Sequence, residues 1–210
     1  MSSLPIVYLG PSLPRTDART ILSADFRPPL RTGDLDALPC YSVVGIVDGV
    51  LDAQSRLCPC EAIRALGRGI RLFGAASTGA LLAAQLRNTG FVGIGRVFSL
   101  VALHPEAADD LVAIIYAAHD DTALTEPLVN AVLAFSENRD LADRRPVGEV
   151  IAALRTIPLH ERTNIAVESR LQSLFPTEQM FHHPTIRNYK AEDVRLLLHH
   201  LESSPTTSSP

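Results

Sequence analysis

The stretch Phe73-Gly74-Ala75-Ala76-Ser77-Thr78-Gly79 decides the fold that we expect for this chain. The apolar run of residues 70–76 predicts a buried strand, and the small residues 78–87 predict a helix. Small residues around Ser77 allow a tight turn, close to the Gly-x-Ser-x-Gly elbow of serine hydrolases with Ala75 in place of the first glycine. Ser77 is therefore a candidate nucleophile or ligand-binding hydroxyl, or a serine that only caps the helix.

The same strand-then-helix pattern continues on both sides of this turn. Residues 6–10 and 41–47 predict strands, and the second run is apolar throughout, which is typical of a parallel strand covered on both faces. A helix is expected to open at Cys58-Pro59-Cys60-Glu61, and residues 93–103 and 111–118 are expected to add two more strands. Short links between these elements favour βαβ units. We therefore expect an α/β fold with a Rossmann-like three-layer parallel sheet flanked by helices, and a C-terminal helical segment.

The pattern turns helical from about residue 125. Two sets of apolar residues have helical spacing and mark two buried helix faces: Val147, Val150, Ile151 and Leu154, and Val194, Leu197, Leu198 and Leu201. We expect an α/β core over residues 1–135, a helical extension packed on it over 136–202, and a disordered tail over 203–210.

Composition favours a globular cytoplasmic protein. Hydrophobic residues make up 46% of the 210 residues and charged residues 20%. The net charge of -4 and the scattered basic residues argue against nucleic acid as a partner. The uncharged run between Arg71 and Arg87 is too short to cross a membrane. We attribute the presence of a single lysine, Lys190, to the base composition of the gene rather than to a mechanism.

The three cysteines do not indicate a disulfide framework or a zinc site. Cys58 and Cys60 are separated by one residue, a spacing that rarely closes a disulfide without strain, and Cys40 leaves the count odd. Cys58 would cap a helix, where the helix dipole favours a thiolate. The pair is either incidental or a reactive thiol site.

Polar side chains follow two consecutive predicted strands. Asp48-Gly49 ends the second and Ser77 ends the third, and parallel strands end at the same edge of a sheet. We expect a site at this edge. Asp109 and Asp110 are further acid/base candidates, although such pairs are more often solvated turns.

Ordered motifs across residues 5–135 resemble the TfuA family. The matching segments are Tyr8-Leu9-Gly10-Pro11-Ser12, Gly33-Asp34-Leu35, Val47-Asp48-Gly49, Glu61-Ala62-Ile63-Arg64-Ala65-Leu66, the segment from Phe73 to Leu86, Gly93-Ile94-Gly95, the segment from Asp109 to Ile114, and Thr125-Glu126-Pro127-Leu128-Val129-Asn130.

The resemblance implies a partnership with a YcaO enzyme, which uses ATP to activate a peptide backbone amide, usually to form a thioamide. The resemblance further implies that the protein recruits or hydrolyses a thiocarboxylated sulfur-carrier protein. The carrier is therefore a second implied partner, and the precursor peptide is an indirect one. No cofactor and no metal are implied, and a homodimer is left open.

The resemblance also suggests roles for individual residues. Ser77 would be the nucleophile, with Asp48 and Glu61 as polar support and Asp109 or Asp110 as an acid/base partner. The residues expected to bind substrate are Gly10, Ser12, Gly49, Thr78, Gly79 and Asn130.

Several charged residues of the family are replaced in this chain. The replacing residues are Cys60 for Lys, Leu82 for Arg, Gln85 and Leu111 for Glu, and Tyr116 for His. Three hypotheses follow: an accessory hydrolase for peptide thioamidation in natural-product (antibiotic) biosynthesis, a non-catalytic module that docks and allosterically activates a YcaO enzyme, and a sulfur relay through Cys58 or Cys60.

Overall fold

The computed structural model describes residues 4–51, 57–117, 119–175 and 187–203. The chain divides into two compact units. The first comprises residues 1–102 and 190–210, and the second comprises residues 103–189. Most of the tail predicted to be disordered, residues 204–210, lies outside the described residues.

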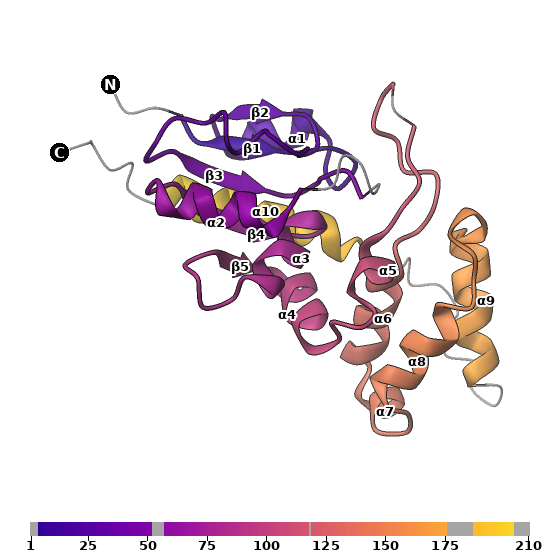
Figure 1. Cartoon of the computed structure of the whole chain (residues 1–210). Coiled ribbons are helices and arrows are strands. Elements are labelled where there is room, and N and C mark those ends of the chain that lie inside the picture. The colour runs from indigo at the N-terminus through magenta and orange to yellow at the C-terminus, as the bar shows by residue number, and fades with distance from the viewer. Residues whose placement is uncertain (1–3, 52–56, 118, 176–186, 204–210) are drawn as a thin grey trace. The chain divides into compact units, whose positions relative to one another are not determined.

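A five-stranded parallel sheet forms the centre of the first unit (Figure 1). Its strands are β1 (Ile6–Tyr8), β2 (Asp25–Arg27), β3 (Val43–Ile46), β4 (Arg71–Ala75) and β5 (Val92–Ile94). Their order is β2-β1-β3-β4-β5, and every neighbouring pair is parallel. The expected α/β fold is confirmed. This order is that of flavodoxin-type doubly wound sheets, which place the ligand crevice at the carboxyl edge where the winding reverses, between β1 and β3.

Helices cover both faces of this sheet. The helices are α1 (Arg15–Ile21), α2 (Pro59–Gly67), α3 (Thr78–Gln85), α4 (Gly95–Leu103) and α10 (Tyr189–Ser203). Apolar residues of α2 and α3 pack with Val44 and Leu72 on one face, whereas residues of α1 and α10 pack with Val7 and Phe73 on the other. In Figure 1, α2 lies in front of the sheet and α10 behind it. The apolar face predicted for α10 is buried, because Val194, Leu197, Leu198 and Leu201 are all shielded from solvent.

Three local predictions were wrong. Strand β2 was not foreseen, because it is a short edge strand that is partly exposed. Residues 93–103 form mainly helix α4 rather than a strand, since Gly95 turns the chain with a φ of 97° and its apolar residues bury one helix face. Of the strand expected over residues 111–118, Leu111 and Val112 end helix α5 (Ala108–Val112), Tyr116 forms an isolated bridge, and residue 118 lies outside the described residues.

The expectation that Cys58 and Cys60 form no disulfide is also wrong. The two residues are bonded to each other. Their Cα atoms are 5.2 Å apart, within the range that a disulfide spans, because the chain turns into α2 between them. Cys40 is exposed and free.

The second unit is helical. Besides α5, it contains α6 (Leu128–Glu137), α7 (Arg139–Ala142), α8 (Val147–Leu154), a 3₁₀ turn (Leu159–Glu161) and α9 (Asn164–Leu174). The predicted apolar face of α8 is largely buried, and the rings of Phe135 and Phe175 stack with centroids 5.7 Å apart.

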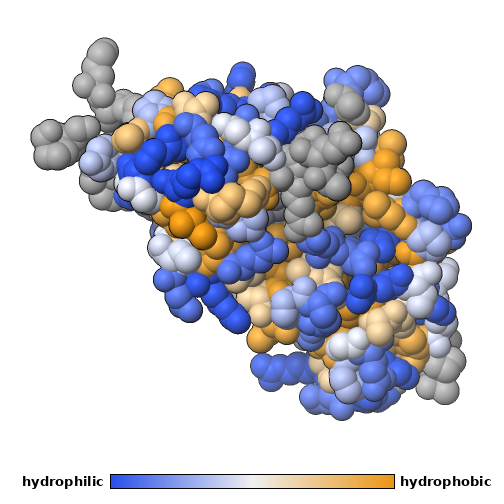
Figure 2. Space-filling model, viewed as in Figure 1, coloured by the Kyte–Doolittle hydropathy of each residue, from blue (hydrophilic) through white to orange (hydrophobic). Residues whose placement is uncertain are grey.

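After α5, the chain of this unit forms a short antiparallel pairing. Tyr116 bridges to Ala123, and the Leu124 N–H donates to the Ile115 carbonyl at 2.8 Å. Figure 2 shows hydrophobic surface along it, in agreement with the exposed side chains of Ile115 and Leu124. No helix among the described residues combines the length and apolar character that a membrane span requires.

Candidate active site

The central feature of the site is a contact between Ser77 and Lys190. The Lys190 Nζ donates to the Ser77 Oγ at 3.3 Å, and both side chains are buried, with exposed fractions of 2% and 6%. Ser77 occupies the N-cap position of α3, but its hydroxyl makes no capping hydrogen bond. The interpretation of Ser77 as a helix cap is therefore wrong, and its hydroxyl faces the one lysine of the chain instead.

The turn that carries Ser77 is tight and holds a non-glycine residue in an unfavourable conformation. Ala76 has a φ of 64°, in the left-handed region that residues with a Cβ seldom adopt. The flanking glycines permit close packing: a Cβ on Gly79 would collide with the Ile46 carbonyl, and a Cβ on Gly74 with the Gly79 carbonyl. Because backbone strain of this kind persists only where surrounding packing imposes it, the turn fixes the direction of the Ser77 side chain.

The first residues of α3 also bind the end of the neighbouring strand. The Gly79 N–H donates to the Val47 carbonyl at 3.1 Å, and the Thr78 hydroxyl donates to the Gly49 carbonyl at 3.1 Å. These contacts place Gly49, Thr78 and Gly79 side by side at the edge of the sheet. Helix N-termini leave N–H groups without intrahelical partners, so the Thr78 N–H, next to Ser77, is suitably placed for an oxyanion.

Asp48 binds the loop after β1 rather than Ser77. Its Oδ2 accepts from the N–H groups of Gly10 and Ser12 at 2.9 and 3.1 Å, and its Oδ1 accepts from the Ser12 hydroxyl at 2.6 Å. The Asp48 side chain is 3% exposed. The structure thus brings Gly10, Ser12 and Asp48 together where β1 and β3 end, and the carboxylate holds the two strand ends side by side.

Asp193 fixes the helix that carries Lys190. It lies one turn further along α10, and its carboxylate accepts from the N–H groups of Arg96 and Val97 at 3.0 and 2.8 Å, at the start of α4. A Cβ on Gly95 would collide with this carboxylate. Burial raises the pKa of Asp193 to about 6, although the two N–H donors act to lower it. Asp193 therefore anchors α10 to α4 and sets the position from which Lys190 reaches Ser77.

A family model described as TfuA-like protein matches residues 48–163, more than half of the 210 residues. The chain belongs to the TfuA-like family. This family is associated with YcaO-dependent thioamide biosynthesis. No curated protein matches the sequence.

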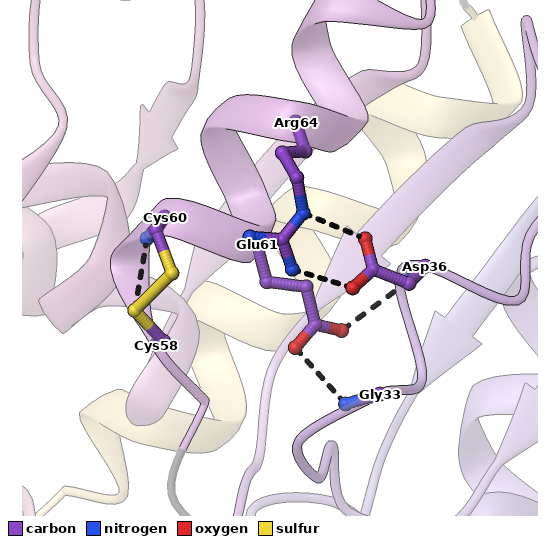
Figure 3. The surroundings of a disulfide bond; sticks show 6 residues. All are labelled: Gly33, Asp36, Cys58, Cys60, Glu61 and Arg64. Carbon is purple, nitrogen blue, oxygen red and sulfur yellow. Dashed lines mark hydrogen bonds and ion pairs between the residues drawn. A yellow bond between two sulfur atoms is a disulfide. The ribbon is translucent and has the colours of Figure 1, made fainter.

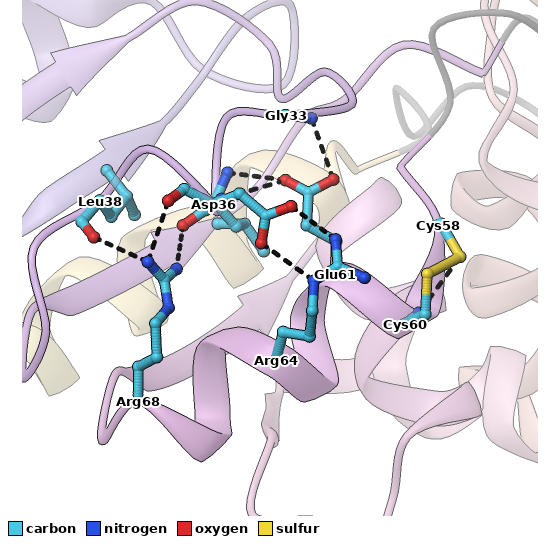
Figure 4. A network of polar contacts seen from close by, with 9 residues as sticks. Gly33, Asp36, Leu38, Cys58, Cys60, Glu61, Arg64 and Arg68 are labelled. Carbon is cyan, nitrogen blue, oxygen red and sulfur yellow. Dashed lines mark hydrogen bonds and ion pairs between the residues drawn. A yellow bond between two sulfur atoms is a disulfide. The ribbon is translucent and has the colours of Figure 1, made fainter.

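Glu61 of this TfuA-like protein fastens a loop of the first unit. Its carboxylate accepts from the N–H groups of Gly33, Leu35 and Asp36 at 2.9, 2.8 and 3.3 Å, and it is 1% exposed. Arg68 reaches carbonyls of the same loop (Figure 4). These contacts attach α2 to the loop of residues 31–38.

The remaining predicted site residues of the TfuA-like chain lie in the second unit. Asn130 donates to the Glu126 carboxylate at 2.8 Å, and Asp109 stands beside Asp110 at the start of α5. Asp110 pairs with Arg155 at 2.8 Å and with buried Arg162 at 3.2 Å. Partial burial acts to raise the pKa of Asp110, but the hydrogen bonds from the two arginines hold it below its usual range. This arrangement suits a structural ion pair. Among the described residues, no group of three or more His, Cys, Asp and Glu side chains could hold a metal ion.

Sequence reasoning missed Lys190, although one signal was available. Lys190 precedes Val194 by four residues and so falls on the buried apolar face predicted for that helix. A lysine on such a face is rare and needs a partner. The resemblance to TfuA-like proteins could not help, because it ended near residue 135.

Proposed function

We propose that this protein is a serine–lysine hydrolase that releases sulfide from a thiocarboxylated sulfur-carrier protein. The sulfide would serve a YcaO enzyme that thioamidates the backbone of a ribosomally made peptide. The observation that carries the proposal is the buried 3.3 Å contact between Lys190 Nζ and Ser77 Oγ, at a strand–helix turn in a TfuA-like chain.

In the first step, Ser77 attacks the thiocarboxylate carbonyl carbon. Its Oγ forms the new bond while the neutral amine of Lys190 takes the hydroxyl proton. A lysine can act as a general base where its ammonium form is desolvated, as in this buried position. The Thr78 N–H and the N-terminus of α3 stabilise the negative oxygen that develops on the former carbonyl.

In the second step, the carbon–sulfur bond breaks. Lys190 returns its proton to the sulfur, hydrosulfide leaves, and Ser77 carries an acyl ester. Water, deprotonated by Lys190, then hydrolyses the ester and restores Ser77. One thiocarboxylate and one water give one carboxylate and one hydrogen sulfide.

The decisive experiment measures hydrogen sulfide release from a thiocarboxylated sulfur-carrier protein. Ser77→Ala is expected to abolish release above the background rate, because it removes the nucleophile. Ser42→Ala is the matched control: Ser42 is also a buried serine, but it precedes β3 at the opposite edge of the sheet and donates to the Pro39 carbonyl. Unchanged release by Ser77→Ala would contradict the nucleophilic role.

A second assay separates hydrolysis from docking. The YcaO enzyme, its peptide and this protein are combined with one of two sulfur donors, the thiocarboxylated carrier or inorganic sulfide. If Ser77→Ala supports full thioamidation with the carrier as the donor, the protein is a docking module that activates the YcaO enzyme. If Ser77→Ala supports thioamidation only with inorganic sulfide, hydrolysis is the required activity.

A further inference from the structure

The disulfide at the start of α2 is not explained by the contacts that stabilise this helix. Cys58 caps the helix, Pro59 and Cys60 follow, and all three residues are exposed. Figure 3 shows the two sulfur atoms bonded at the helix end, with the Glu61 side chain turned toward the loop at Gly33. The disulfide therefore lies open to solvent beside a structural contact that does not use it.

A purely structural role would contribute little. The stabilisation that a disulfide provides in the chain-entropy model grows with the loop it closes, and here only Pro59 separates the two cysteines. Helix α2 is held independently by Glu61, by Arg64 with Asp36 and by Arg68, as well as by buried Ala62 and Ala65 (Figure 4). Exposed disulfides are the ones that react with thiols.

The fold places this disulfide at the same edge of the sheet as Ser77. Helix α2 connects β3 to β4, and α3 connects β4 to β5, so both helices run back along the same face and begin at the carboxyl edge. The strands that lead into them, β3 and β4, are direct neighbours. Neighbouring helices on a sheet lie about 10 Å apart. Hydrosulfide released at Ser77 would thus form at the same edge of the sheet at which α2 and the disulfide begin.

We propose that Cys58 and Cys60 form a thiol–disulfide centre that captures hydrosulfide as a persulfide on Cys60. The source of hydrosulfide rests on the proposed hydrolysis at Ser77. Hydrosulfide attacks the Cys60 Sγ, a new sulfur–sulfur bond forms, and the bond to Cys58 breaks. The hydrosulfide sulfur is oxidised by two electrons and the disulfide is reduced by two, so no other oxidant is needed.

The geometry decides which sulfur leaves. The Cys58 Sγ accepts a hydrogen bond from the Cys60 N–H at 3.3 Å, at the N-terminus of a nine-residue helix. Helix N-termini stabilise a thiolate, and a more stable thiolate leaves faster. Cys58 is therefore the leaving group, and the persulfide stays on Cys60.

The test uses the purified full-length protein and sodium sulfide as the probe. The protein is first isolated without reductant and its thiols are counted by alkylation and mass spectrometry, which should show one free thiol, Cys40. After addition of sodium sulfide and a second alkylation, the peptide with Cys58 and Cys60 should gain one sulfur on Cys60. The gain should disappear in Cys58→Ser and Cys60→Ser and persist in Cys40→Ser, the exposed free cysteine that serves as control.

Three outcomes would overturn the proposal: three free thiols in the protein isolated without reductant, no added sulfur, or added sulfur confined to Cys58. Ser77→Ala should take up added sulfide as fast as wild type, and Cys60→Ser should release sulfide from the carrier as fast as wild type. The failure of either activity is thus distinguishable from the failure of the other.

Discussion

The buried polar groups of the first unit fall into two kinds that differ in what they bind. Asp48 and Glu61 each accept three hydrogen bonds from other parts of the chain, mostly backbone N–H groups. Ser77 and Lys190 instead meet through their side chains. All four are almost fully shielded from solvent, so burial alone does not separate the two kinds.

The two kinds of buried polar group differ in their hydrogen-bond partners. A carboxylate whose oxygens are occupied by N–H groups holds loops in place, and its loss leaves buried donors unpaired. A hydroxyl held by an amine keeps the combination that nucleophilic catalysis requires, a nucleophile with a base in reach. Substitutions of the first kind should therefore cost stability, and substitutions of the second kind should cost activity.

Replacing Lys190 should produce the largest effect. Lys190→Met removes the base but retains a similar apolar volume, and we expect sulfide release to fall by about 10³-fold or more with little change in the urea midpoint. Lys190→Arg places a permanent positive charge beside Ser77 but cannot act as a base, because arginine does not give up its proton. Release by Lys190→Arg at the wild-type rate would assign Lys190 an electrostatic role only.

Removing Asp48 should be the largest change in stability. Asp48→Ala leaves the N–H groups of Gly10 and Ser12 unpaired, and we expect a loss of about 3 kcal/mol in the free energy of unfolding, measured with urea. Asp36→Ala is the control, since Asp36 is an exposed carboxylate paired with Arg64 and should cost less. Equal losses in the two variants would show that the buried hydrogen bonds of Asp48 stabilise the fold no more than an exposed ion pair does.

The sheet and its flanking helices could be predicted because their signals are local. The apolar run before Ser77 and the small residues after it lie within one segment, and the strand ends at Asp48 and Ser77 follow from the parallel order. Strand β2 has no comparable apolar signal. The apolar run that contains α4 was predicted to be a strand, because the sequence does not show that Gly95 turns the chain and ends the strand there.

The contact between Ser77 and Lys190 could not be predicted from any local pattern. Ser77 and Lys190 are 113 residues apart, and their contact depends on α10 returning from beyond the second unit to the sheet. The same holds for Asp193 and the N–H groups of Arg96 and Val97. Such contacts depend on tertiary packing, whereas periodicity reports only which face of a helix is buried.

Asp193 combines features of both kinds and should give a smaller, pH-dependent effect. It binds backbone N–H groups, yet burial raises its pKa to about 6. The folded protein therefore binds the Asp193 proton more tightly than the unfolded chain does. Protonation of Asp193 thus adds to the free energy of unfolding below about pH 4, and this stabilisation is lost as the pH rises to about 6. The shift corresponds to about 2–3 kcal/mol.

The measurement compares wild type with Asp193→Asn across this pH range. The variant does not titrate at this position, so the stability of wild type relative to the variant should decrease between about pH 4 and pH 7. Urea unfolding at a series of pH values gives this difference directly. Parallel stability curves would show that Asp193 has an ordinary pKa in the folded protein.

The smallest effect is expected at Ala76, where one substitution should change both stability and activity. Ala76 has a φ of 64°, and glycine adopts this conformation without a steric cost, so Ala76→Gly should raise the free energy of unfolding by about 0.5–1 kcal/mol. Glycine also loosens the turn that directs Ser77 toward Lys190, so sulfide release should fall by less than about 10-fold. Urea unfolding and the sulfide assay on the same preparation test both halves. A variant that is more stable and equally active would show that packing of Gly74 and Gly79, and not the strained residue before Ser77, sets the direction of the nucleophile.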